Sequence, residues 1–120
     1  MAGALYSQHF GEVELRCPCC GRLEMQADFM QKLEWLRVKY GKSFVPNSAF
    51  RCPKHNAEVG GEPDSQHLLG RACDIPCTNS SDRYRLVFCA LELHLNVIVY
   101  ETFVHVDNRA NPVLLIGKSK

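Results

Sequence analysis

A chain of 120 residues is long enough for one domain with a single modest core. Charged residues make up 22% of the chain and the net charge is only +1, so the composition is globular and carries no electrostatic signature of nucleic-acid or anionic-membrane binding. Residues 1–10 lack the basic and apolar regions of a signal peptide, and no stretch is long enough to span a membrane, so we expect a soluble protein made in the cytoplasm.

The first half of the chain predicts two helices, a turn and an extended segment. Residues 10–15 alternate weakly between polar and apolar types and lead into a tight, cysteine-containing turn at residues 17–21. Apolar side chains recur every three or four positions over residues 27–40, which predicts a core-packing helix that the next glycine ends. Residues 43–50 are predicted to be extended, and residues 53–59 to form a short helix with proline in its first turn.

The second half predicts one more helix and the strands of a small sheet. Residues 82–94 have helical periodicity, with an apolar stripe formed by Tyr84, Val87, Phe88 and Leu91. Strands are expected at residues 71–75, 97–100, 103–107 and 112–116, and the basic residues 118–120 are expected to form a solvated tail. Since the strands do not alternate regularly with helices, we predict an α+β fold in which a small antiparallel sheet is flanked by helices.

A histidine and a carboxylate lie on either side of a predicted glycine turn. His67 and Asp74 are too far apart in sequence to share one helix face, but Gly70 between them can adopt a positive φ and bend the chain. Imidazole and carboxylate together suit zinc. A third ligand is needed, and His105, inside a predicted apolar strand, is either that ligand or a buried core histidine.

The residues around this turn resemble a family signature. They match, position for position, the pattern Ser-x-His-x-x-Gly-x-Ala-x-Asp of zinc D-Ala-D-Ala carboxypeptidases and L-Ala-D-Glu endopeptidases. The matching positions are Ser65, His67, Gly70, Ala72 and Asp74. Residues 103–107 resemble the later strand that carries the last histidine ligand, and residues 48–51, 55–56 and 59–61 are similar to segments of short, phage-type members. The resemblance covers residues 29–107 and implies a fold like that of D,D-peptidases and the sonic hedgehog amino-terminal domain.

The resemblance implies one catalytic zinc ion held by His67, Asp74 and His105. Three protein ligands leave a fourth position for water, which is typical of catalytic rather than structural zinc. Bound zinc lowers the pKa of that water to about 7 and polarises a neighbouring carbonyl group. Arg51 matches the family's upstream arginine, which implies that it stabilises the oxyanion formed by attack on an amide or holds a substrate carboxylate.

The chain departs from the family pattern at the general base. Many members have Asp or Glu three residues before the last histidine, but here that position is Thr102 and the carboxylate belongs to Glu101. A shift by one residue turns a strand side chain to the opposite face, so Glu101 reaches the water only if the backbone turns or bulges. We favour Glu101 as the base. Asp107, which shares a face with His105, is expected to act as an alternative base or to orient the imidazole, and Ser65 to bind substrate or cap the turn.

Seven cysteines are many for a chain of this length. Without a secretion signal, we expect them to be reduced, with the buried ones acting as small hydrophobic residues. Cys17 and Cys20 could instead join Cys52 and His55, which have the same spacing, in a structural zinc site. We favour the interpretation in which reduced cysteines shape and pack the turn, and keep the zinc site as the alternative.

The function that the resemblance implies is zinc-dependent hydrolysis of amide bonds in peptidoglycan stem peptides. We expect a monomeric, endolysin-like carboxypeptidase or endopeptidase that accumulates in the cytoplasm and meets the cell wall after phage-mediated release. The alternative is a zinc domain that binds a wall peptide or a protein partner without hydrolysis. Release of amino groups from peptidoglycan, with and without a chelator, separates the two functions.

Overall fold

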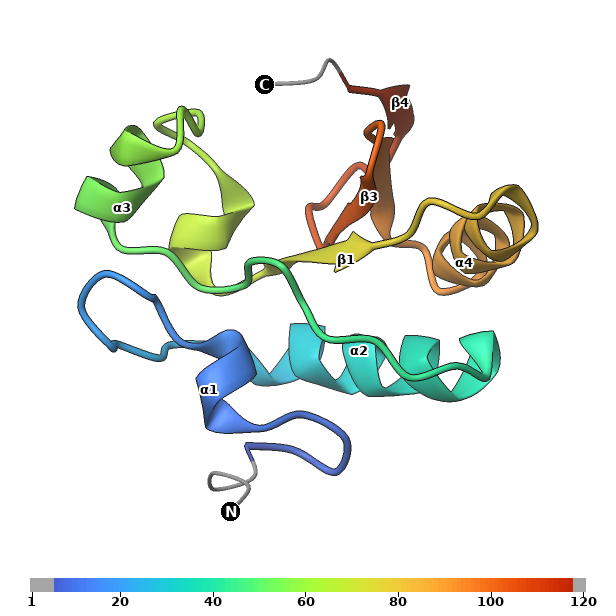
Figure 1. The fold of residues 1–120 in the computed structure, drawn as a ribbon, viewed down its shortest axis with the longest axis horizontal. Coiled ribbons are helices and arrows are strands. Elements are labelled where there is room, and N and C mark those ends of the chain that lie inside the picture. The colour runs from blue at the N-terminus through green and yellow to red at the C-terminus, as the bar shows by residue number, and fades with distance from the viewer. Residues whose placement is uncertain (1–5, 118–120) are drawn as a thin grey trace.

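The computed structural model describes residues 6–117, so the predicted basic tail lies outside the described residues (Figure 1). The fold is α+β, as the sequence predicts. The helical elements are α1 (Glu12–Leu15), α2 (Ala27–Tyr40), α3 (Pro53–Glu58), the short 3-10 helix η1 (Gln66–Leu69) and α4 (Ser80–Glu92). The strands are β1 (Ala72–Pro76), β2 (Asn96–Val99), β3 (Phe103–Asp107) and β4 (Leu114–Ile116). Over the part of the chain that is described, every helix is too short or too polar to cross a membrane.

The strands form one sheet in the order β1-β3-β2-β4. β3 is antiparallel to both of its neighbours, but β4 runs parallel to β2, so the prediction of an antiparallel sheet is wrong for this strand. The cause is the connection after β3, which crosses the start of β2 at Asn96 before β4 begins. The Asn96 side chain fixes this crossing, because its Oδ1 accepts a hydrogen bond of 2.8 Å from the Val113 backbone N–H.

Helix α2 has the bounds that the periodicity predicts. It buries Phe29, Met30, Leu33, Leu36 and Tyr40 and packs against α4 beneath the sheet (Figure 1). Gly41 ends the helix with a left-handed φ of 79°, a conformation in which a side chain would be strained. The five buried residues of α2 belong to the hydrophobic core.

Helix α4 is present, but it buries a different face from the expected one. Tyr84, Phe88 and Leu91 of the predicted apolar stripe are exposed, whereas Leu86, Cys89 and Ala90 are buried. Apolar residues occur on both sides of this helix, so their spacing alone does not choose the buried side. The helix packs against α2 and β2, and its buried residues include the small side chains of Cys89 and Ala90, which suit close packing.

Two further segments precede the sheet: residues 10–15 are partly helical, and residues 43–50, predicted to be extended, contain no helix. The weakly alternating residues 10–15 contain the short helix α1, whose start is capped by the Glu14 carboxylate accepting a 2.8 Å bond from the Gly11 N–H. The predicted extended segment runs beside β1 and pairs with it at a single bridge, between Ser48 and Asp74. There, the Asp74 N–H donates to the Ser48 carbonyl and the Asn47 N–H donates to the Asp74 carbonyl, each at 2.8 Å.

The predicted turn at Gly70 is observed and has a steric reason. Gly70 follows η1 with a φ of 69°, and a Cβ atom there would lie 1.8 Å from the Glu24 carbonyl oxygen. Its own carbonyl accepts a 2.9 Å bond from the Gln26 N–H at the start of α2. Only glycine fits both the backbone conformation and this contact. The turn therefore brings η1 and β1 together, which places His67 beside Asp74.

Candidate metal centre

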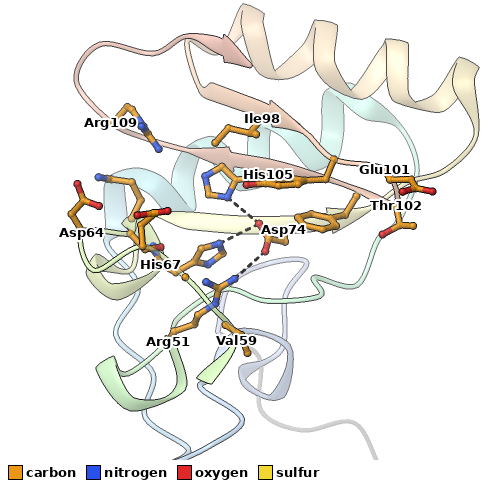
Figure 2. A pocket seen from close by; sticks show the side chains of 16 residues that line it. Arg51, Val59, Asp64, His67, Asp74, Ile98, Glu101, Thr102, His105 and Arg109 are labelled. Atoms are coloured by element: carbon orange, nitrogen blue, oxygen red, sulfur yellow. Dashed lines mark hydrogen bonds and ion pairs between the residues drawn. The ribbon is translucent and has the colours of Figure 1, made fainter. Parts of the chain in front are cut away.

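Three buried side chains from three elements meet in front of the sheet. His67 comes from η1, and Asp74 and His105 are direct partners in the register of β1 and β3. The Asp74 Oδ1 atom lies 3.2 Å from His67 Nε2 and 3.0 Å from His105 Nδ1. Figure 2 shows the three side chains pointing toward one another. One ligand atom from each residue lies within 4.8 Å of the other two, which is the arrangement of a metal site.

The opposite nitrogen of each imidazole is anchored by an acceptor. His67 Nδ1 lies 2.6 Å from the Ala49 carbonyl, and His105 Nε2 lies 2.7 Å from the Asp107 carboxylate. Because these acceptors require a proton on the nitrogens they contact, the free lone pairs of His67 Nε2 and His105 Nδ1 face Asp74 Oδ1. Three electron-rich atoms then converge, and either a shared proton, as in the hydrogen bonds to Asp74, or a cation can lie between them. A divalent cation fits this donor set, and imidazole nitrogen with carboxylate oxygen suits zinc.

The electrostatics of the three residues also favour a cation at this position. Burial alone would raise the pKa of Asp74, but hydrogen bonds to His105 and His67 hold that pKa well below its ordinary value. Burial would lower the pKa of His105, yet Asp107 and Asp74 together raise it, since two carboxylates favour positive charge on the ring. At His67 burial prevails and lowers the pKa. The Asp74 carboxylate therefore stays ionised and the His67 ring neutral, as metal ligands must be, whereas a bound cation would displace a proton from the His105 ring.

Arg51 holds the second oxygen of the same carboxylate. Its Nη2 donates to Asp74 Oδ2 at 3.2 Å, its Nε to Ser48 Oγ at 2.9 Å and its Nη1 to Asn56 Oδ1 at 3.1 Å. Burial lowers the pKa of the Arg51 guanidinium, although the Asp74 charge opposes this shift. Arg51 thus binds Oδ2 and leaves Oδ1 to face the histidines. Both terminal nitrogens of the guanidinium carry a second hydrogen that can serve a ligand.

The three-residue cluster opens onto a cavity of about 630 Å³, which lies within the size range of ligand sites. Arg51, His67, Asp74 and His105 form one wall of this cavity. Other lining residues are Glu62, Asp64, Ser65, Tyr100, Glu101, Thr102, Phe103 and Arg109. An ion on these three ligands would therefore face open space, where water and a substrate can enter.

The structure places the two predicted carboxylates differently. Glu101 is exposed on the turn between β2 and β3 and lines the cavity, and Figure 2 shows it beside Thr102, away from Arg109. Asp107 is fully buried behind the His105 ring and is not among the described residues that line the cavity. It accepts hydrogen bonds from His105, from Asn96 at 3.0 Å and from Arg109 at 2.7 Å. This geometry suits a residue that orients the imidazole.

Ser65 both caps a turn and lines the cavity. Its Oγ accepts a 3.2 Å bond from the His67 N–H at the start of η1, so it helps to set the position of that ligand. Its place on the cavity wall is also compatible with the predicted contact to substrate.

Sequence reasoning missed several residues of the site. Tyr100 lines the cavity and stacks on Phe103 with ring centroids 4.5 Å apart. Asn56, which is 3% exposed, links Arg51 to the Glu62 carbonyl through a 2.8 Å bond from its Nδ2. Asn96 was detectable, because a polar residue that opens a buried apolar strand needs a partner. Arg109 gave no comparable signal, since it lies in the loop after β3.

The fold and site together define a small α+β domain with a His-Asp-His cluster of potential metal ligands at the mouth of a cavity, as in mononuclear metal-dependent hydrolases. A model of the Peptidase M15 family matches residues 3–107, and the chain belongs to this family. It is therefore a peptidase by family, and the family is in general zinc-dependent. A search of curated proteins gave no match.

Proposed function

We propose that this protein is a zinc-dependent peptidase that hydrolyses amide bonds in peptidoglycan stem peptides. The observation that supports the proposal best is the set of three preoriented ligands, His67, Asp74 and His105, at the mouth of a cavity in a member of the Peptidase M15 family. Each ligand is held by a separate partner, so the site needs little rearrangement to accept an ion. When bound, zinc would supply a water of lowered pKa and polarise the amide carbonyl.

Arg51 and Arg109 place a guanidinium group on either side of the histidines (Figure 2), in a cavity that is also lined by the carboxylates of Glu62, Asp64 and Glu101. We assign to Arg51 the stabilisation of the oxyanion or the binding of a substrate carboxylate, through the hydrogens that it does not give to Ser48, Asn56 and Asp74. Stem peptides carry carboxylates and fit this pair of charges. Ser65 is proposed to contribute a hydrogen bond to the bound peptide.

Glu101 is the residue that we propose as general base. It would take a proton from the attacking water and return it to the leaving amine. The turn that carries it is held by Arg83, whose Nη1 donates to the Glu101 carbonyl at 2.7 Å and whose Nη2 donates to the Tyr100 carbonyl at 2.6 Å. Glu101 is exposed and lines the cavity, so it lies where a bound peptide would be within its reach.

The test measures amino groups released from purified peptidoglycan and from isolated stem peptides, with and without a chelator. We expect release that the chelator stops and added zinc restores. His67→Ala should abolish release, whereas His94→Asn should retain it, because His94 lies outside the cavity and Asn tolerates its left-handed φ of 59°. Mass spectrometry of the products identifies the bond and separates carboxypeptidase from endopeptidase activity.

A second candidate function is binding of wall peptide or a protein partner without hydrolysis. Two features favour it: Glu101 is exposed, and Thr102 stands at the position where many members of the family that the chain resembles have the general base. Zinc-loaded protein that sediments with peptidoglycan but releases no amino groups from any wall type would support binding and refute the peptidase proposal. If the protein is a peptidase, we place its action at the cell wall, as a monomeric, endolysin-like enzyme.

A further inference from the structure

A second cluster of potential metal ligands lies outside the cavity. The thiols of Cys17, Cys20 and Cys52 lie within 4.8 Å of one another. They come from two segments, the turn after α1 and the start of α3, and none of them lines the cavity beside His67. Cys17 and Cys52 are buried, and Cys20 is exposed. All three are free thiols, so they are available as ligands.

The two segments present their cysteines in the same way. Each begins with Cys-Pro and has a second potential ligand three residues after the first cysteine: Cys20 after Cys17, and His55 after Cys52. In the first turn, Gly21 adopts a φ of 76° and its N–H donates to the Cys17 carbonyl at 2.8 Å. At the second, the His55 N–H points at Cys52 Sγ from 3.4 Å. Such turns hold two ligands on one side of the chain.

The buried Cys17 sulfur has a backbone donor from the other segment. The Cys52 N–H donates to Cys17 Sγ at 3.5 Å, so the two segments already meet at this atom. A backbone N–H that faces sulfur favours the thiolate, which is the form that binds metal.

We propose that Cys17, Cys20, Cys52 and His55 form a structural zinc site. Three thiolates and one imidazole make up a closed tetrahedral set, which is typical of structural zinc and differs from the open nitrogen-and-oxygen set at His67. The His55 imidazole lies on the first turn of α3, with Nδ1 3.9 Å from Glu58 Oε1, and would turn toward the thiols to complete the site.

The site would join the amino-terminal segment to the wall of the cavity. Cys52 directly follows Arg51, whose guanidinium binds Asp74, and the Arg51 N–H donates to the His67 carbonyl at 3.2 Å. One residue earlier, the Phe50 N–H donates to the Leu15 carbonyl at 3.1 Å. A zinc ion at Cys52 would therefore fix the backbone on both sides of Arg51. Small domains gain stability from such cross-links.

The decisive test compares two adjacent exposed cysteines in the unmodified chain. Zinc-loaded protein is alkylated, digested and analysed by tandem mass spectrometry, before and after chelation. We expect zinc to protect Cys20 and to leave Cys19 reactive, because both are exposed but only Cys20 belongs to the cluster. Chelation should make Cys20 as reactive as Cys19. Equal reactivity of the two thiols in the zinc-loaded protein would overturn the proposal.

Metal counting and cobalt spectroscopy provide an independent readout. His67→Ala should keep the thiolate-to-cobalt charge-transfer absorption, Cys52→Ser should lose it, and each variant should bind one zinc ion fewer than the wild type. His55→Ala should weaken zinc binding by at least about 10–100-fold, the loss that follows removal of a residue that only orients a ligand, because His55 is proposed as a ligand itself. An unchanged affinity in this variant would refute the role of His55. None of these results depends on peptidase activity, so they stand or fall separately from the proposed function.

Discussion

Replacing Asp107 by asparagine tests whether the His105 imidazole is held for metal binding. The carboxylate is fully buried and accepts bonds from His105 at 2.7 Å, Asn96 at 3.0 Å and Arg109 at 2.7 Å. Arg109 adds two bonds to the other oxygen, from its backbone N–H and its Nε. These interactions hold the pKa of Asp107 well below its ordinary value, against the effect of burial. Asp107→Asn removes the carboxylate charge and replaces one of its oxygens by an NH2 group, which cannot accept these hydrogen bonds.

The size of the effect follows from the number of bonds affected. Loss of a partner that orients a histidine ligand lowers metal affinity by about 10–100-fold, which is about 1.4–2.8 kcal/mol of binding free energy. The buried amide would also face hydrogen-bond donors, which destabilises the fold by about 1–3 kcal/mol, whereas Arg109, with a side chain that is 39% exposed, stays partly solvated. Asp107→Asn should therefore bind zinc more weakly and unfold at lower denaturant concentration than the wild type.

The assay is a zinc titration in competition with a chelator, accompanied by circular dichroism to establish that the variant is folded. Cys52→Ser is titrated alongside, so that loss at the His67 site is told apart from loss at the thiols. Asp64→Asn is the matched control, because it removes a carboxylate that is exposed on the cavity wall. Its affinity should stay within about twofold of the wild type, as is usual for exposed charges. A folded Asp107→Asn protein with wild-type zinc affinity would refute the reasoning.

Three further predictions address stability, substrate and proton transfer. Gly70→Ala should lower the free energy of unfolding by more than about 2 kcal/mol, because backbone strain at its φ of 69° adds to the clash of the new Cβ atom with the Glu24 carbonyl. Gly60→Ala is the control: its φ is 74°, but a Cβ atom there would have no atom within 4 Å, so it should show the backbone strain alone. Arg51→Lys should lower kcat/KM by about 100–1000-fold with zinc still bound, since lysine lacks the planar fork; retained activity would contradict its role. Glu101→Gln should lower kcat by about 100–10,000-fold, whereas Glu62→Gln should not; equal losses would point to charge rather than proton transfer.

The convergence of His67, Asp74 and His105 could be predicted because a glycine turn and the family resemblance both indicate it. A glycine that tolerates positive φ returns the chain from η1 to β1. The pairing of Asp74 with His105 joins distant parts of the chain, and only the resemblance indicates it from the sequence. The roles of these residues as zinc ligands remain predictions that metal analysis will test.

Other features could not be predicted, because distant contacts decide them. The face that α4 buries depends on its packing against α2 and β2, and the helix has apolar side chains on both sides. The parallel pairing of β4 depends on the Asn96 side chain holding a loop distant in sequence. The direction of Glu101 depends on a turn that Arg83 holds from α4. The meeting of Cys17 and Cys20 with Cys52, which the spacing indicates only as an alternative, likewise depends on packing between separate segments.

The bridge between Ser48 and Asp74 has a consequence for self-association. It covers the outer margin of β1, so another chain cannot add a strand beside the cavity. The opposite margin is β4, where Leu114, Leu115 and Ile116 are 49%, 48% and 80% exposed. An uncovered, apolar outer strand is a template for aggregation. Concentrated solutions of this protein should therefore aggregate through β4, and a lysine at Leu115 should slow that process without altering the cavity.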